Sequence, residues 1–175
     1  MQHSDGTFDE WYHRERSYAA TAFSLFAAGE AMLLLEEAGH GAFAGRSGVL
    51  NAVDRAASWL VGRHDPHVSN HSAGGIAALQ CAALLTGQDR YSRAAADQLS
   101  QLASAQHSEG WLPEYRGMDP GYLTVAVGYL AAYAERGGPP LAKEIAERAL
   151  GAAAIGVNPD GSFGGAFGSR NTAFL

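Results

Sequence analysis

One segment of the sequence recurs about a hundred residues later, and this repeat limits the fold more than any other feature. The segments DGTFDEWYHRERSYAATAFSLFAA and EGWLPEYRGMDPGYLTVAVGYLAA align without a gap at an offset of 104 residues, which sets Asp5 on Glu109 and Tyr18 on Tyr122. A weaker copy between them has His71 at the position of Tyr18. The sequence therefore predicts one structural unit about every fifty residues.

Apolar residues within each unit follow a helical period, and no segment alternates as a β-strand would. Ser17, Ser47 and Ser72 are predicted N-caps, and Gly39 and Gly87 are predicted C-terminal caps. We predict six helices, over residues 17–38, 47–63, 72–86, 89–105, 121–136 and 140–155.

The predicted helices alternate in character along the chain. The first, third and fifth are apolar almost all round and rich in small residues, whereas the other three carry charged stripes. Repeated hairpins of a buried and a charged helix are typical of solenoids and closed α/α toroids, and the alternation favours a toroid. Another copy begins at DGSF (160–163). We predict an all-α, partial α/α toroid: a single domain over residues 1–175, with three hairpins and the loop of a fourth.

Charge and cysteine content exclude several classes of function. The formal net charge is −6 and Lys143 is the only lysine, so nucleic acid is not an expected partner. Cys81 is the only cysteine, which excludes an internal disulfide and a cysteine-based zinc cluster and suits a reducing compartment. We expect no metal and no cofactor.

The sequence also argues against insertion into a membrane. Glu30, Glu36 and Glu37 interrupt the longest apolar helix. Residues 1–5 lack the basic and apolar regions of a signal peptide. We therefore expect a soluble protein in the cytoplasm.

Most of the histidines, and many of the arginines, fall in or beside the loops that lead into the apolar helices. In a toroid these loops lie at one end, so Tyr18, His71 and Tyr122 are expected to converge there. The helix N-termini at that end add partial positive charge, which favours an anionic ligand. The cationic residues in these loops are His3, His13, Arg14, Arg16, Arg63, His64, His67, His71, His107, Arg116 and Arg170.

Two segments carry a resemblance to a known family. SNHSAGGIAALQCAALLTG (69–87), followed by EGWLPEYRGMDPGY (109–122), resembles the toroid domain of heparinase-type and alginate-type polysaccharide lyases. In that family an Asn-His pair opens an inner helix, and a Tyr follows in the loop before the next inner helix. The resemblance covers roughly residues 59–135.

The resemblance implies a β-elimination on an acidic oligosaccharide or polysaccharide. Asn70 and His71 would neutralise the uronate carboxylate, and Tyr122 would move the proton, with Tyr115 as the second choice. Substrate-binding candidates from the same loops are Tyr18, Arg14, Arg16, Trp11, His107, Trp111, Arg116, Arg170 and Asn171. A homo-oligomer that completes the ring is a further expected partner.

Two alternatives remain open. The loop NPDGSFGGAFGSRN (158–171) resembles turns of terpenoid-cyclase and prenyltransferase toroids, which leaves a cyclase-like enzyme as one of them. A noncatalytic module for glycan binding or assembly is the other. Paired carboxylates of the glycosidase kind are also present, but we interpret them as a solvated acidic face: Asp9, Glu10, Glu15, Glu109, Glu114 and Asp119.

Overall fold

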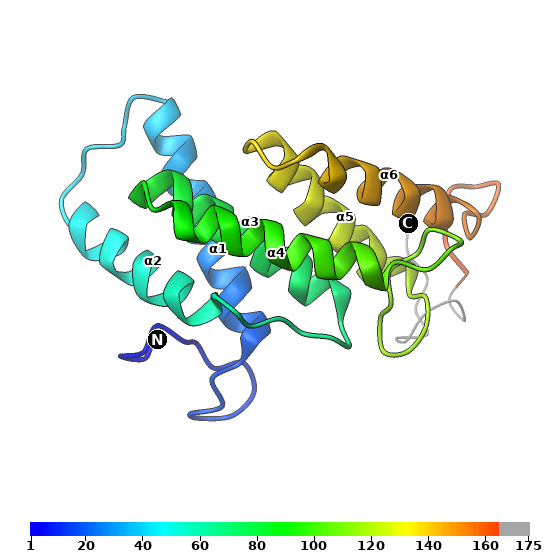
Figure 1. Ribbon diagram of the computed structural model, residues 1–175, viewed down its shortest axis with the longest axis horizontal. Helices are drawn as coiled ribbons and strands as arrows, with labels where there is room; N and C mark the ends of the chain where they lie inside the picture. The colour runs from blue at the N-terminus through cyan, green and yellow to red at the C-terminus, as the bar shows by residue number, and fades with distance from the viewer. Residues whose placement is uncertain (165–175) are drawn as a thin grey trace. The chain divides into compact units, whose positions relative to one another are not determined.

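The computed structural model describes residues 1–164, which form six α-helices and no strand longer than an isolated bridge (Figure 1). The all-α prediction is therefore confirmed over these residues. The helices are α1 (Tyr18–Glu37), α2 (Arg46–Leu60), α3 (Ser69–Thr86), α4 (Asp89–Ala105), α5 (Pro120–Glu135) and α6 (Pro140–Ala154).

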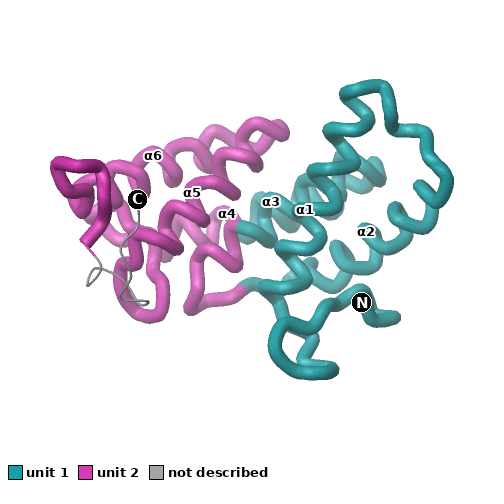
Figure 2. Tube along the Cα trace, turned by 180° about the vertical axis from the view of Figure 1, so that it is seen from behind, with its two compact units in different colours: residues 1–64, 74–98 teal, residues 65–73, 99–175 magenta. Residues whose placement is uncertain are grey.

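The chain divides into two compact units (Figure 2). The first unit holds residues 1–64 and 74–98, with α1 packed on α2. The second holds residues 65–73 and those from 99 onward, with α5 packed on α6. The partial toroid and its single domain stay predictions.

Helix boundaries follow the predicted caps in part. Ser17 is the N-cap of α1, and its hydroxyl accepts the N–H of Ala20. The prediction for Ser47 is wrong, because α2 begins one residue earlier after Gly45, which has a left-handed φ of 91°. The prediction for Ser72 is also wrong, since α3 already begins at Ser69.

The sequence prediction undervalued the apolar character of α1. By length and composition, α1 is the one helix within the described residues that could cross a membrane, and 39% of its most apolar window is buried in the protein. Glu30, Glu36 and Glu37 do not exclude a span, because an 18-residue window of α1 holds at most two charged residues. The core helix of a soluble protein passes the same test. The absence of membrane insertion and the cytoplasmic location stay predictions.

The sequence repeat has a structural counterpart in the turns that begin the two copies. Gln2 Nε2 donates to the carbonyl oxygens of Gly6, at 3.0 Å, and of Ala52 in α2, at 2.9 Å. Gln106 Nε2 donates to the Gly110 carbonyl, at 2.7 Å, and to a carbonyl oxygen of α6, at 3.0 Å. In each copy, therefore, a glutamine side chain holds the turn on the second helix of its own hairpin.

Close backbone approach explains the glycine in each of these turns. Gly6 has a φ of 94°, and a Cβ there would lie 2.4 Å from the carbonyl carbon of Arg55. Gly110 has a φ of 98°, and a Cβ there would lie 2.6 Å from the carbonyl oxygen of Arg148. A side chain at either position would separate the turn from its helix.

Candidate functional site

The loop before α3 and the loop before α5 run side by side in the second unit. Val68 forms an isolated antiparallel bridge with Glu114. The N–H and the hydroxyl of Ser69 both donate to the Pro113 carbonyl, at 3.2 and 2.7 Å. These bonds bring the first turn of α3 next to the loop that carries Tyr115.

Glu114 is the buried centre of this loop pair, with 2% of its surface exposed. Its carboxylate accepts the Asn70 N–H at 2.7 Å and the Asn70 side-chain amide at 2.9 Å. Burial raises the pKa of the Glu114 carboxyl to about 7 against the lowering effect of these hydrogen bonds, and the charges of Asp119 and Asp65 add to the rise. The interpretation of the loop carboxylates as a solvated face is therefore wrong for Glu114 and for Asp119, which is 4% exposed.

Asn70 holds this loop against α3. It is 2% exposed, and both its backbone N–H and its side-chain amide bind Glu114. The first turn of a helix has backbone N–H groups without intrahelical partners, and a carboxylate satisfies one of them here. The Asn70 side-chain amide therefore makes a hydrogen bond within the protein, to Glu114.

His71 forms a hydrogen-bonded pair with Asp65, which the sequence prediction missed. Nδ1 of His71 lies 2.9 Å from Oδ2 of Asp65. Because a carboxylate can only accept, Nδ1 carries the proton, and Nε2 of the neutral ring carries the lone pair. The other oxygen of Asp65 accepts the N–H groups of His67 and Val68, at 2.9 and 3.2 Å. Asp65 thus orients the imidazole and holds the turn that leads into α3; an Asp-Pro step ahead of a helix was the available signal.

Tyr115 and Tyr122 are in ring contact, with centroids 5.5 Å apart. Tyr122 is half-buried near the start of α5, and its N–H donates to the N-cap Asp119 at 3.1 Å. Tyr115 is 53% exposed and has a φ of 50°, followed by Arg116 with a φ of 76°. Two consecutive left-handed residues cost on the order of 1–3 kcal/mol each, and such strain is often found where side chains are positioned for function.

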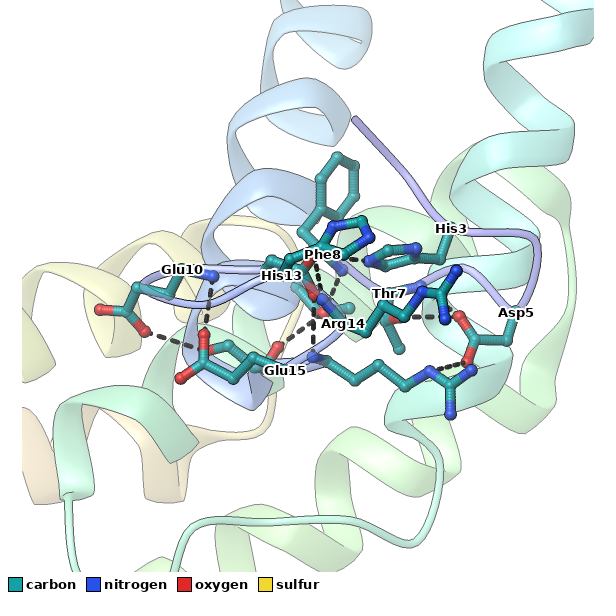
Figure 3. Close-up of polar contacts among 12 residues, drawn as sticks. His3, Asp5, Thr7, Phe8, Glu10, His13, Arg14 and Glu15 are labelled. Atoms are coloured by element: carbon teal, nitrogen blue, oxygen red, sulfur yellow. Dashed lines mark hydrogen bonds and ion pairs between the residues drawn. The ribbon is translucent and has the colours of Figure 1, made fainter.

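The loop before α1 is pinned by its own carboxylates (Figure 3). Asp9 accepts the N–H groups of Arg14 and Arg16, at 2.8 and 3.0 Å, and pairs with His3 Nε2 at 2.8 Å. The Arg16 N–H contributes most to holding the pKa of the Asp9 carboxyl well below its usual range. Arg14 and Arg16 have φ values of 63° and 58°. Asp9 therefore holds a strained loop closed.

The same loop presents aromatic side chains to solvent. Trp11 is 77% exposed and Tyr12 is 75% exposed. Their backbone is fixed by Glu15, which accepts the N–H groups of Glu10 and Trp11, both at 2.9 Å. A fixed backbone with exposed rings is suited to stacking on a ligand.

Tyr18 has a packing role in the first unit. Its hydroxyl lies 3.3 Å from Oε1 of Gln98, and its ring lies 6.4 Å from that of Trp59. A Cβ at Gly75 would lie 2.1 Å from the Tyr18 hydroxyl oxygen, so Gly75 leaves the space that this ring occupies. Tyr18 belongs to the first unit and Tyr122 to the second, and their convergence stays a prediction.

The remaining binding candidates divide between the second unit and the undescribed end of the chain. His107 stacks on Trp111 with centroids 4.2 Å apart, and the Trp111 indole N–H donates to Glu109 at 3.1 Å. Arg116 is exposed beside Tyr115. The two other candidates, Arg170 and Asn171, lie outside the described residues.

Chemically, the second unit brings together an oriented imidazole, two phenols and a buried carboxyl. Within residues 1–164, no group of three or more His, Cys, Asp or Glu side chains is arranged to hold a metal ion. No protein family, curated protein or solved structure matches this chain.

Proposed function

We propose that this chain is a carbohydrate-active enzyme of the polysaccharide-lyase kind, which cleaves an acidic glycan by β-elimination on a partial α/α toroid. The observation that carries the proposal is the Asp65–His71 pair, 2.9 Å from Nδ1 to Oδ2, in the unit where the loop residue Tyr115 contacts Tyr122 at the start of α5. An imidazole held by a carboxylate can either bear a compensated positive charge or move a proton at Nε2.

The reaction divides between these groups. With a proton on Nε2 as well, His71 is charged and compensated by Asp65, and in this form it neutralises the uronate carboxylate and makes the proton on the neighbouring carbon more acidic. Tyr122 removes that proton as phenolate, and the electron pair left on carbon forms a C=C bond as the β C–O bond breaks. The leaving oxygen takes a proton from a phenol, Tyr122 itself or Tyr115. The product carries an unsaturated sugar end, and no oxidant or reductant is needed.

Asn70 has a different role in this proposal from the one that the family resemblance implies. Because its amide is buried and donates to Glu114, we assign it to positioning. It holds the loop that carries Tyr115 against the first turn of α3, which carries His71.

The test is incubation with a panel of uronate polysaccharides, followed by ultraviolet absorbance of unsaturated ends. Tyr122→Phe and His71→Ala are expected to abolish the signal. Tyr18→Phe is the matched control, because Tyr18 is the repeat counterpart of Tyr122 and packs in the first unit. Absence of absorbance from the wild-type protein across the panel overturns the proposal.

A noncatalytic glycan-binding module is the second candidate, favoured by the exposed Trp11 and Tyr12 on their pinned loop. Such a module binds the same polysaccharides without producing unsaturated ends, and Trp11→Ala removes the binding. Glycan affinity without turnover therefore selects the module over the lyase.

A further inference from the structure

The loop before α1 binds its own donors with its carboxylates. Asp9 accepts the N–H groups of Arg14 and Arg16, at 2.8 and 3.0 Å. Glu15 accepts two further backbone N–H groups of the loop, both at 2.9 Å, and Glu10 accepts the hydroxyl of the N-cap of α1, at 2.9 Å. The negative charges of this acidic segment therefore hold the loop in its conformation.

The guanidinium of Arg14 has no such partner. Its backbone N–H is bound, but its side chain makes no hydrogen bond or ion pair within residues 1–164. Arg14 is exposed, and in Figure 3 its side chain extends away from Glu10 and Glu15. Arg16, by contrast, pairs with Asp5 at 3.0 Å. The loop thus presents one uncompensated cation to solvent.

The backbone of Arg14 is in a conformation that arginine rarely adopts. Its φ is 63°, in the left-handed region that glycine and asparagine occupy with least strain. The repeat does not explain the cations here, because the counterparts of His13 and Arg14 at the offset of 104 residues are Gly117 and Met118. A strained arginine that the repeated packing does not require is a reason to look for a function of its side chain.

Two exposed aromatic rings precede this guanidinium in the chain. Trp11 is 77% exposed and Tyr12 is 75% exposed, on a backbone that Glu15 fixes. An exposed indole offers a flat apolar face for stacking on a sugar ring. A guanidinium offers parallel N–H donors that match the geometry of a carboxylate or a sulfate. The loop therefore combines the two kinds of contact that bind an acidic sugar.

Charge favours a sugar chain over an anionic membrane as the ligand of this loop. The chain has a formal net charge of −6, and an anionic bilayer attracts proteins through a broad basic surface. A sugar chain contacts only a few side chains, so the local charge decides its binding. Residues 11–14 include no acidic residue, Arg14 is cationic, and the His13 side chain is 82% exposed.

We propose that residues 11–14 form a second binding site for an acidic sugar chain, in which a sugar ring stacks on Trp11 and an acidic group pairs with Arg14. Asp9 is the positioning residue, because it holds the backbone of Arg14. The inference deepens the proposed function and rests on it for the ligand, an acidic glycan. The site lies in the first unit, outside the residues assigned to β-elimination, and its charge selects acidic over neutral glycans. It binds the glycan whether or not the second unit cleaves it.

The test is affinity electrophoresis of the full chain in native gels that contain polygalacturonate, alginate, heparin or the neutral polymer dextran. Tyr122→Phe is measured beside the wild type, so that cleavage does not remove the polymer. We expect the acidic polymers to retard both proteins and dextran to retard neither. In either background, Arg14→Gln should weaken the affinity for the acidic polymers about 10- to 100-fold, the range expected for hydrogen bonds between charged groups.

Arg93→Gln is the matched control. Arg93 is an exposed arginine on α4 of the same unit, and its side chain also has no partner within residues 1–164. Its replacement changes the net charge by the same amount and should leave the affinity unchanged. Equal losses in Arg93→Gln and Arg14→Gln would show that net charge alone attracts the polymer, which overturns the proposal.

Arg14→Gly separates a binding role from a structural one. Glycine suits the positive φ, so this variant should keep or raise the thermal stability while it loses affinity as Arg14→Gln does. A lower unfolding temperature in Arg14→Gly would show that the guanidinium stabilises the loop instead, and the proposal would be wrong.

Further outcomes overturn the proposal: the wild type binds none of the acidic polymers, dextran binds equally well, or Arg14→Gln binds as tightly as the wild type. Binding to phosphatidylserine vesicles without binding to the polymers would identify a membrane as the ligand and also overturn it. The proposed lyase activity fails separately. Unsaturated ends with an affinity independent of Arg14 leave the lyase and remove this site, whereas Arg14-dependent affinity without unsaturated ends does the reverse.

Discussion

Glu114 and Asn70 form a two-point hydrogen bond between residues 44 positions apart in the chain, with the carboxylate accepting at 2.7 and 2.9 Å. The bond joins the loop before α5 to the first turn of α3, and it is buried at both partners. A carboxyl in this position is costly to ionise. Its protonation state therefore influences how firmly Tyr115 and His71 are held in one arrangement.

The stability of the protein should depend on pH through Glu114. Burial raises the pKa of this carboxyl in the folded protein to about 7, from 4.5 in its absence. The folded state therefore holds the proton where the unfolded state has lost it, and the stability present below pH 4.5 is lost as pH rises to about 7. The loss amounts to roughly 3 kcal/mol. Urea unfolding at a series of pH values, wild type against Glu114→Gln, measures it.

The control for this experiment is Glu10→Gln. Glu10 is the repeat counterpart of Glu114, but it is exposed and accepts the Ser17 hydroxyl. It should leave the pH profile of the wild type unchanged. Parallel profiles for wild type and Glu114→Gln between pH 4.5 and 7 would contradict the assignment.

Replacing Asn70 should weaken the loop pair from its other side. Asn70→Ala removes the side-chain donor and leaves the buried carboxylate with only the backbone N–H of this residue, at a cost of about 1–3 kcal/mol. In the Glu114→Gln background the same change should cost less, because the carboxylate is no longer present. A double-mutant cycle by urea unfolding measures this coupling, and additive effects would show that the pair is not coupled.

The sequence predicted the helical segments well, but it predicted less well which loop side chains are buried. Helical periodicity is a local signal, so the six helices were within reach of sequence patterns. Cap positions follow less directly from sequence: Ser47 is a residue type typical of an N-cap, but Gly45, with its left-handed φ, precedes α2. Asn70 and Tyr115 were selected from the repeat and the family resemblance, and the structure places both in the second unit.

Burial of the loop carboxylates could not be read from local sequence. Glu114 stands among other acidic residues, which is the pattern of a solvated face, and its partner Asn70 lies 44 positions away. The two glutamines that hold the repeated turns could be identified from the sequence. Gln-His-Ser recurs at 2–4 and 106–108, just before the aligned segments begin. This recurrence predicts that Gln2 and Gln106 have the same role.

Gly6 and Gly110 should be costly to replace. Gly6→Ala and Gly110→Ala each combine an unfavourable positive φ with a Cβ less than 3 Å from a helix backbone, and each should cost more than about 2 kcal/mol. Gly87→Ala has a positive φ in open space and should cost about 1 kcal/mol. Thermal unfolding of the three variants ranks them, and equal costs would contradict the close approach.

Asp65 should determine which ring nitrogen of His71 carries the proton. The carboxylate fixes the proton on Nδ1 and leaves the lone pair on Nε2. In Asp65→Asn the amide can donate as well as accept, so the imidazole is free to exchange tautomers, while the side-chain oxygen can still accept the N–H groups of His67 and Val68. We expect a small change in stability, a shift of the His71 ring nitrogens in ¹⁵N NMR towards a tautomer mixture, and a fall of about 10²–10⁴ in β-elimination rate.

His67→Gln is the control, because His67 is exposed and only its backbone N–H binds Asp65. An unchanged ¹⁵N spectrum in Asp65→Asn would show that another group orients the imidazole, and the role assigned to Asp65 would then be wrong even if the enzyme is active.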